Sequence, residues 1–332
     1  MKLPDFEFAS PATVAEACGY LEGGRDETQV IAGGTELLVA LKEGQKTPKL
    51  VVDLGAIEGL DGMDYAPDSG LEIGALVTLR QLAANPTIRE HYPLLAHAAL
   101  QVGTPQLQNM ATVGGNLCQD SCCMYFTRPA EIRLPLPPCH KLGGCVCHVV
   151  PTSPKCWAPY SGDMAPALMA IGATVTVADR NGEKTMAVGD IYTEDGARPV
   201  VLEAGQLITK IHCPAPKPRS GAVYIKMRLR NILDYAVAGV AASVRLDDAG
   251  ENCAEAAVVL TGVGSSPMAV PESAELADGA LSDAAVDKVA EAATKLSYPV
   301  KNVLGADPGY RRAMVKLNVA RSLREAALMA AA

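Results

Sequence analysis

The sequence predicts an α+β protein with a larger α/β N-terminal part and a smaller C-terminal part made of a three-stranded sheet with helices. In the N-terminal part, short apolar strands alternate with amphipathic helices. After a proline-rich stretch at 214–220, three strand-like segments precede two Ala-rich helical ones, the order typical of an α+β domain. The 332 residues suffice for two to three domains.

The first elements form a β-turn-α-β unit. Residues 11–21 have helical apolar spacing, with Ser10 as the expected N-cap and glycines at the end. Residues 29–31 read as a strand, a Gly-rich turn then leads into a helix that Gly44 ends, and residues 50–54 form a second strand.

A second α/β region follows. We expect a strand at 71–75, a helix at 78–84 capped by Thr78, a helix at 93–102, and a Gly-rich turn with strand-like flanks at 112–117. Periodicity is lost over residues 118–159, where seven prolines prevent long helices.

Regular structure resumes after this segment. Asp163 is a good N-cap for a helix at 164–171, a strand follows at 173–178, and Asn181-Gly182 predicts a hairpin. The C-terminal part has expected strands at 222–230, 238–246 and 256–262, and helices at 283–296 and 308–330.

Composition excludes several classes of function. The formal net charge is −8 without a basic stripe, so nucleic acid is not an expected partner. No apolar run is long enough for a membrane span, and the N-terminus lacks an apolar signal core, so we expect a cytoplasmic location.

Ten cysteines are distributed very unevenly. Most of them lie in one segment and are Cys118, Cys122, Cys123, Cys139, Cys145, Cys147 and Cys156. In a reducing compartment such clusters bind metal more often than they form disulfides. Zinc sites usually have pairs spaced C-x₂₋₄-C, which Cys145 and Cys147 do not match, and the adjacent Cys122 and Cys123 rarely both ligate one ion. Any four-ligand set is therefore dispersed, and an iron–sulfur cluster, zinc and disulfides remain alternatives.

Two Gly-rich turns are candidate anion sites. Residues 32–35 place two glycines between a strand and a helix N-terminus, where backbone N–H groups suit a pyrophosphate, and residues 112–116 form a similar backbone surface. Neither is a GxGxxG fingerprint or a P-loop, and two ordinary tight turns are the alternative.

Three ordered motifs together resemble a known family. Residues 31–38, 111–117 and 162–168, with segments 224–242 and 310–313, are similar to the FAD-binding subunit of molybdenum hydroxylases. This family includes the medium subunits of carbon monoxide dehydrogenase-type enzymes and the flavin domain of xanthine dehydrogenase. The resemblance implies a two-lobed FAD-binding domain, with lobes at 1–55 and 56–220, and a C-terminal α+β domain at 221–332.

The resemblance also implies roles by position. The diphosphate is expected at the backbone of Ile31, Ala32, Gly33, Gly34, Thr35 and Glu36. The other expected cofactor residues are Gly103, Thr112, Gly115 and Asn116, Asp163 near the adenosine half, Ile208 beside the isoalloxazine, and Lys226 at the flavin's polar edge. The alternatives are a helix cap for Asp163, a core position for Ile208 and a solvated strand position for Lys226.

The cysteine-rich segment replaces a short loop that is usual in the family. Here the chain resembles most the β subunits of 4-hydroxybenzoyl-CoA reductases, which carry a [4Fe-4S] cluster in this loop. The matching positions are Cys123, Cys139, Cys147 and Cys156, so the resemblance leaves Cys118, Cys122 and Cys145 outside the ligand set.

The expected function is that of an electron-transfer flavoprotein subunit without catalytic residues of its own. The resemblance implies a molybdopterin-containing large subunit and a [2Fe-2S] small subunit as partners, as a dimer of heterotrimers, and an external electron carrier such as ferredoxin or NAD(P). The direction of electron flow stays open. A zinc-stabilised assembly module and a free-standing NAD(P)H flavin oxidoreductase are the alternatives.

Overall fold

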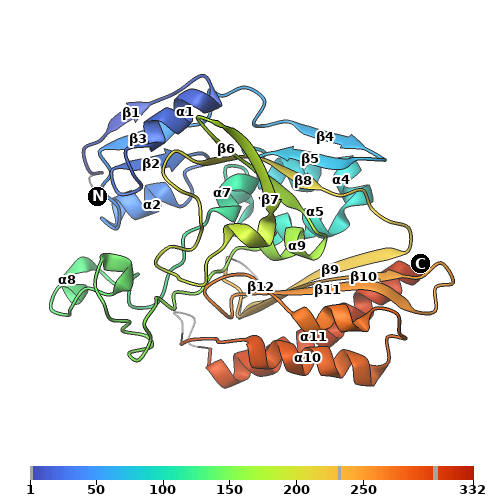
Figure 1. Ribbon diagram of the computed structural model, residues 1–332. Coiled ribbons are helices and arrows are strands. Elements are labelled where there is room, and N and C mark those ends of the chain that lie inside the picture. The colour runs from blue at the N-terminus through green and yellow to red at the C-terminus, as the bar shows by residue number, and fades with distance from the viewer. Residues whose placement is uncertain (1–2, 231–232, 302–305) are drawn as a thin grey trace.

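Three sheets organise the chain in the computed structural model, which describes residues 3–230, 233–301 and 306–332. The first sheet is parallel and has the order β1 (Glu7–Ala9), β3 (Leu50–Asp53), β2 (Thr28–Ile31). Helices α1 (Val14–Leu21) and α2 (Leu37–Lys42) accompany it at the N-terminal end of the molecule (Figure 1). The predicted β-turn-α-β unit is therefore confirmed, and a third strand is added to it.

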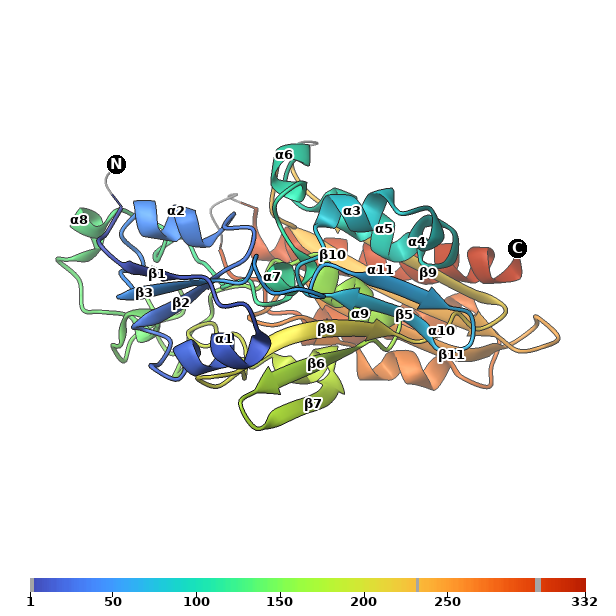
Figure 2. The same cartoon turned by 90° about the horizontal axis from the view of Figure 1, so that it is seen from above.

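The second sheet is antiparallel, and a crossover carries its last strand into its centre. Its order is β4 (Met63–Ala66), β5 (Gly70–Gly74), β8 (Leu207–Cys213), β6 (Thr174–Asp179), β7 (Gly182–Ala187). The helices that pack with it are α3 (Leu79–Ala84), α4 (Pro86–His91), α5 (Pro93–Gln101) and α9 (Met164–Ala170). Figure 2 shows α3, α4 and α5 gathered along one side.

The C-terminal sheet has four strands where three were expected. Its order is β12 (Met268–Ala269), β11 (Cys253–Thr261), β10 (Ala238–Leu246), β9 (Ser220–Met227). Helices α10 (Asp283–Leu296) and α11 (Pro308–Ala331) pack on one face, while Tyr224, Ala241 and Val259 belong to the core of the N-terminal part. Both faces of this sheet are therefore covered, which holds the two parts together.

Two local predictions were wrong. The first helix is capped by Thr13 instead of Ser10, because Thr13 accepts the backbone N–H of Glu16 and the Glu16 carboxylate accepts the N–H of Ala12. The Gly-rich segment expected as a turn with strand-like flanks is a short helix, α7 (Val113–Leu117).

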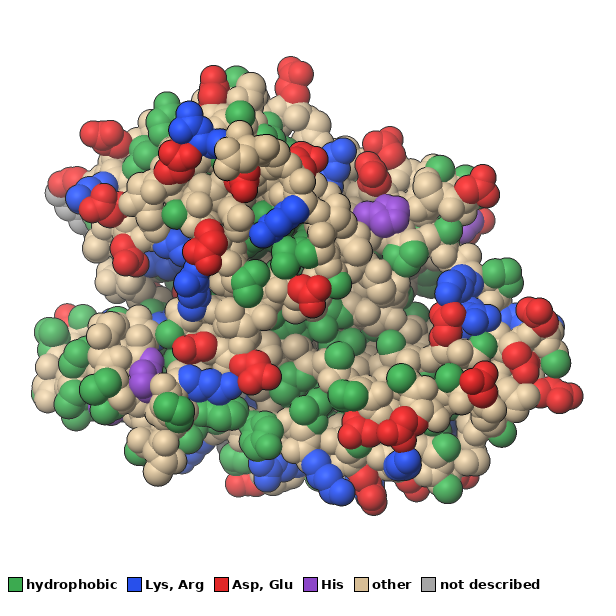
Figure 3. Space-filling model, viewed as in Figure 1, with side chains coloured by type: hydrophobic (Ala, Val, Ile, Leu, Met, Phe, Trp, Pro, Cys, Tyr) green, Lys and Arg blue, Asp and Glu red, His purple; other side chains and the backbone are tan. Residues whose placement is uncertain are grey.

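The cysteine-rich segment is irregular, as predicted, and projects from the body beside the first sheet (Figure 1). Its regular structure is limited to α8 (Ala130–Arg133) and a 3₁₀ turn at His140–Leu142. Figure 3 shows apolar side chains gathered on this projection, where Ile132, Leu134 and Leu136 are exposed. Among the described residues, none of the helices has the length and apolar character needed to cross a membrane.

Candidate functional site: two glycine turns and a cysteine-lined hollow

The first glycine turn connects β2 to α2 and is held against the second turn region. Gly34 has φ +70°, which L side chains rarely adopt. A Cβ atom on Gly33 would lie 1.7 Å from the carbonyl oxygen of Met110, so only glycine allows this approach. The turn is therefore fixed in position by its glycines and leaves its backbone partly exposed.

The second glycine turn is the first turn of α7. Thr112 caps this helix, and its Oγ1 accepts the backbone N–H of Gly115 at 3.1 Å. Gly115 itself is exposed. The Asn116 Oδ1 accepts the backbone N–H of Met164 at 3.1 Å, which joins α7 to the start of α9.

Asp163 stands at the N-cap position of α9 but makes no capping hydrogen bond. Its buried carboxylate accepts hydrogen bonds from the Tyr224 hydroxyl at 2.5 Å and from Lys226 Nζ at 2.9 Å. Lys226 Nζ also donates to the carbonyl oxygen of Gln101 at 2.9 Å. Burial raises the pKa of Asp163, and the Lys226 ammonium opposes this shift.

These contacts bring most of the expected cofactor residues into one neighbourhood. Gly33 lies against Met110, two residues before Thr112, and Asn116 accepts a hydrogen bond from the first residue of α9. Lys226 then connects Asp163 to Gln101, two residues before Gly103. Ile208 stays apart from this chain, because it is buried in the N-terminal core, where β8 pairs it with Val177.

Tyr224 is a site residue that sequence reasoning missed. It lies two positions before Lys226 in β9 and therefore projects from the same face of the strand. Because Lys226 was a candidate, this period-two spacing was the available signal. Tyr224, whose hydroxyl donates to the Asp163 carboxylate, is 61 residues away from Asp163 in the sequence, and this separation hid the pairing.

Glu36 connects the first glycine turn with the cysteine-rich segment. Its Oε1 accepts the backbone N–H of Asp120 at 3.0 Å. Crowding by protein atoms and the Asp120 carboxylate raise the pKa of Glu36 to about 7, against the lowering effects of Lys46 and Lys141. The side chain nevertheless remains exposed to solvent.

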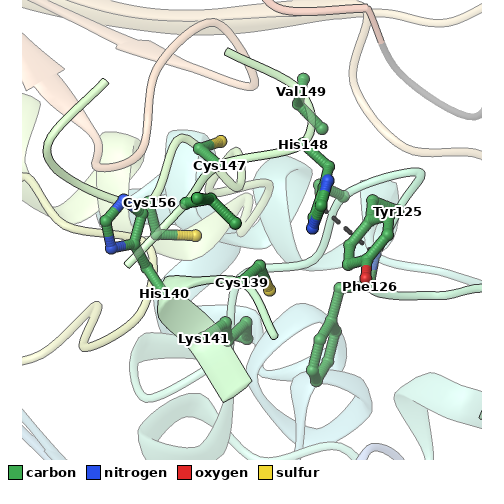
Figure 4. A pocket seen from close by; sticks show the side chains of 11 residues that line it. Tyr125, Phe126, Cys139, His140, Lys141, Cys147, His148, Val149 and Cys156 are labelled. Atoms are coloured by element: carbon green, nitrogen blue, oxygen red, sulfur yellow. Dashed lines mark hydrogen bonds between the residues drawn. The ribbon is translucent and has the colours of Figure 1, made fainter. Parts of the chain in front are cut away.

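Four cysteines line a single hollow that is partly open to solvent. They are Cys123, Cys139, Cys147 and Cys156, the set that the family resemblance selected. Figure 4 shows three of them on separate stretches of loop, with His148 and Tyr125 at another side. We refer to this space as the cysteine hollow.

The thiols of the cysteine hollow receive backbone hydrogen bonds. Cys123 Sγ accepts from Phe126 N–H at 3.4 Å, Cys147 Sγ from Val150 N–H at 3.4 Å, and Cys156 Sγ from Ala158 N–H at 3.5 Å. Such donors stabilise thiolate sulfur at iron–sulfur sites.

The remaining cysteines of the segment do not line this hollow. Cys145 is exposed, and Cys122 lines a second hollow together with Tyr235 and Arg311. Burial raises the pKa of Cys118 to about 12. None of these three cysteines therefore lies at the wall of the cysteine hollow, where Cys139 and Cys147 lie.

Lys141 supplies a buried positive charge at the cysteine hollow. Its side chain is 5% exposed, and Nζ donates to Asp120 Oδ1 at 2.6 Å and to the Gly196 carbonyl oxygen at 2.7 Å. Burial raises the pKa of Cys156 to about 11, although Lys141 opposes this shift. A metal that binds this thiol must therefore displace its proton.

The thiols do not converge on one point. Across the three described stretches of the chain, no three His, Cys, Asp or Glu side chains are arranged to hold a metal ion. The cysteine hollow thus has thiols around its wall without the compact arrangement of a single-ion site.

Comparison with known proteins gives the class that this fold and these turns define. The family model described as the FAD binding domain in molybdopterin dehydrogenase matches residues 4–216, and that of the CO dehydrogenase flavoprotein C-terminal domain matches residues 222–326. These matches define a flavin-binding oxidoreductase subunit. The chain belongs to the FAD-binding medium subunits of the molybdenum hydroxylase family.

Relatives and solved structures agree with this assignment. The FAD-binding subunit of an Escherichia coli (strain K12) aldehyde oxidoreductase is 33% identical and matches over 83% of this chain and 85% of its own length. The carbon monoxide dehydrogenase medium chain of Afipia carboxidovorans is 27% identical over 97% of this chain and 96% of its own length. A carbon monoxide dehydrogenase structure from Hydrogenophaga pseudoflava has a TM-score of 0.80 and 25% identity, covering 98% of both chains.

The titration of Glu36 gives a pH-dependent prediction. Below its pKa of about 7 the carboxyl is neutral, and above it a negative charge stands at the turn expected to hold the FAD diphosphate. We expect the FAD dissociation constant to rise as pH increases from 6 to 8, by about fivefold for a repulsion of roughly 1 kcal/mol. Fluorescence titration of the flavin measures this.

The matched control for this prediction is Glu36→Gln, which cannot ionise. Its FAD affinity should be nearly independent of pH over the same range. An unchanged pH slope in Glu36→Gln would contradict the assignment of this titration to Glu36.

Proposed function

We propose that this chain is the FAD- and [4Fe-4S]-containing electron-transfer subunit of a heterotrimeric molybdenum enzyme, similar to the β subunit of 4-hydroxybenzoyl-CoA reductase. It passes electrons between an external carrier, such as ferredoxin or NAD(P), and partner subunits with [2Fe-2S] and molybdenum centres. FAD suits this position because it exchanges two electrons with one partner and single electrons with iron–sulfur centres.

The cysteine hollow carries this proposal. Four thiols from a segment with little regular structure line one space, and three of them receive backbone N–H hydrogen bonds. Cys123, Cys139, Cys147 and Cys156 are the proposed cluster ligands. Iron–sulfur clusters are held by four thiolates and stabilised by donors of this kind. The Lys141 ammonium, which is paired with Asp120, lies at the wall of the same hollow.

The flavin site is proposed at the two glycine turns. The diphosphate would lie along the backbone of residues 31–36, whose glycines allow close approach. Gly103, Thr112, Gly115, Asn116, Asp163 and Lys226 would complete it. Ile208 lies apart from these contacts in the core, and its proposed place is beside the isoalloxazine. In this arrangement residues 1–55 and 56–220 form the two flavin-binding lobes, and residues 221–332 form the C-terminal domain.

The proposed partners follow from the family to which the chain belongs. Relatives are named as medium chains or FAD subunits, which supports a multi-subunit complex. We expect a tagged chain to copurify with a larger molybdopterin subunit and a smaller [2Fe-2S] subunit, as a dimer of heterotrimers. Mass spectrometry of the native complex measures this, and a monomeric chain that turns over a substrate alone would contradict it.

A second candidate is a flavin subunit that works in the oxidative direction. The observation in its favour is that similar proteins are named nicotinate, carbon monoxide and glyceraldehyde dehydrogenase subunits. The two candidates share the flavin and differ in the cysteine hollow's role and in electron flow. Reduction of the purified complex by its external carrier with subsequent reoxidation by an organic substrate would favour the reductase.

The direct test of the proposal is spectroscopic. The purified complex should show flavin absorbance and an iron–sulfur signal that depends on Cys147. Flavin without any such signal would leave only the second candidate.

A further inference from the structure

Tyr125 is a polar side chain of the cysteine hollow without a protein partner. Its ring lines the hollow, and the residue is 5% exposed. Among the described residues no hydrogen-bond partner reaches its hydroxyl. A buried hydroxyl without a hydrogen bond is destabilising, so such groups normally have a partner.

The position of Tyr125 is fixed by its neighbours. It follows Cys123 by two residues, and the Arg128 N–H donates to its carbonyl oxygen at 3.2 Å. Its ring stacks on His148 with 4.1 Å between centroids, and His148 Nε2 is 2.8 Å from the Pro137 carbonyl oxygen. The Tyr125 side chain is therefore held at the wall of the cysteine hollow, two residues after a proposed ligand, and is not turned to solvent.

We propose that the Tyr125 hydroxyl donates a hydrogen bond to the iron–sulfur group held by the four cysteines, and that this bond raises the reduction potential of the group. The proposal rests on the function proposed above. Reduction adds one electron, supplied by the flavin or the external carrier, and no bond breaks and no proton moves. A donor to cluster sulfur stabilises the more negative, reduced form.

The test is a potentiometric titration of the intact complex with the isosteric variant Tyr125→Phe. Reduction should become about tenfold less favourable, which corresponds to a potential about 59 mV lower for one electron. In parallel, both complexes are reduced in D₂O and compared by electron–nuclear double resonance. The Tyr125→Phe complex should lack one exchangeable deuteron coupling that the parent complex shows. The matched control is Tyr298→Phe, which removes an exposed hydroxyl outside the hollow and should change neither readout.

The outcomes separate this inference from the function it rests on. If the parent complex has no iron–sulfur signal that Cys147→Ser abolishes, the proposed function fails. If that signal is present and Tyr125→Phe leaves the potential and the deuteron couplings unchanged, the role of Tyr125 is wrong. Loss of iron from Tyr125→Phe with flavin retained would also overturn it, because one tuning hydrogen bond is not needed to hold four thiolate bonds.

Discussion

Replacing Cys147 with Ser is expected to remove the iron of the cysteine hollow and to loosen residues 118–159 to proteolysis. The effect is large because this segment has little regular structure, so a bound metal would contribute directly to its stability. The same result is expected for Cys123→Ser, Cys139→Ser and Cys156→Ser. Iron analysis and limited trypsin digestion measure the two effects.

Cys145→Ser is the matched control, because Cys145 lies two residues away and is exposed. Its iron content and digestion pattern should equal those of the parent. Cys122→Ser should behave in the same way. If Cys122→Ser empties the site while Cys123→Ser spares it, the ligand set is wrong even though a cluster exists.

Replacing Gly34 with Val is expected to abolish FAD binding. Gly34 has φ +70°, so a β-branched side chain strains the turn, and its Cβ would stand 3.1 Å from the Leu38 side chain. The branched side chain would also occupy the surface that the diphosphate approaches. Gly115→Val should act similarly, since its Cβ would lie 2.9 Å from Thr112 Oγ1. Flavin content of the purified complex measures the loss.

Gly44→Val separates backbone strain from loss of the cofactor site. Gly44 has φ +64° and nothing within 4 Å of an added Cβ, so it carries the same conformational penalty, about 1–2 kcal/mol, away from the turn. This variant should lose some stability and keep its flavin. Full flavin in Gly34→Val and Gly115→Val would rule out the proposed diphosphate site.

Local patterns predicted much of the fold because they are strong at single elements. The Thr78 cap, the Asn181-Gly182 hairpin and the helix over Asp283–Leu296 all appear in the structure. Each of these signals is contained within a few neighbouring residues, so no tertiary information was needed.

Other features depend on contacts between distant residues and were missed for that reason. The α7 helix contains two glycines, which are poor helix formers, but a Cβ on Gly114 would lie 2.8 Å from Ala75 Cβ, so packing requires glycine there. The strand β12 has two residues and gains its form by pairing with β11. Its sequence alone carries too little pattern.

The candidate sites show the same division. The glycine turns were recognisable as motifs, whereas Lys226 reads as a solvated strand residue until its pairing with Asp163 is known. Spacing alone did not select four of the seven clustered cysteines. The family resemblance selected them, and the folded chain gathers these four around one hollow. Tyr125 had no distinguishing pattern, because an unpaired hydroxyl is a property of the folded structure.

The most direct measurement is metal, sulfide and flavin analysis of the parent complex compared with its Cys147→Ser variant. Both complexes contain the same partner subunits with the same metal centres. The difference between their iron and sulfide contents therefore reports only what the cysteine hollow holds. The proposed function predicts a loss of about four iron and four sulfide per copy of this chain, with FAD retained. Zinc in place of iron, or equal iron in both proteins, would contradict an electron-transfer role for this segment.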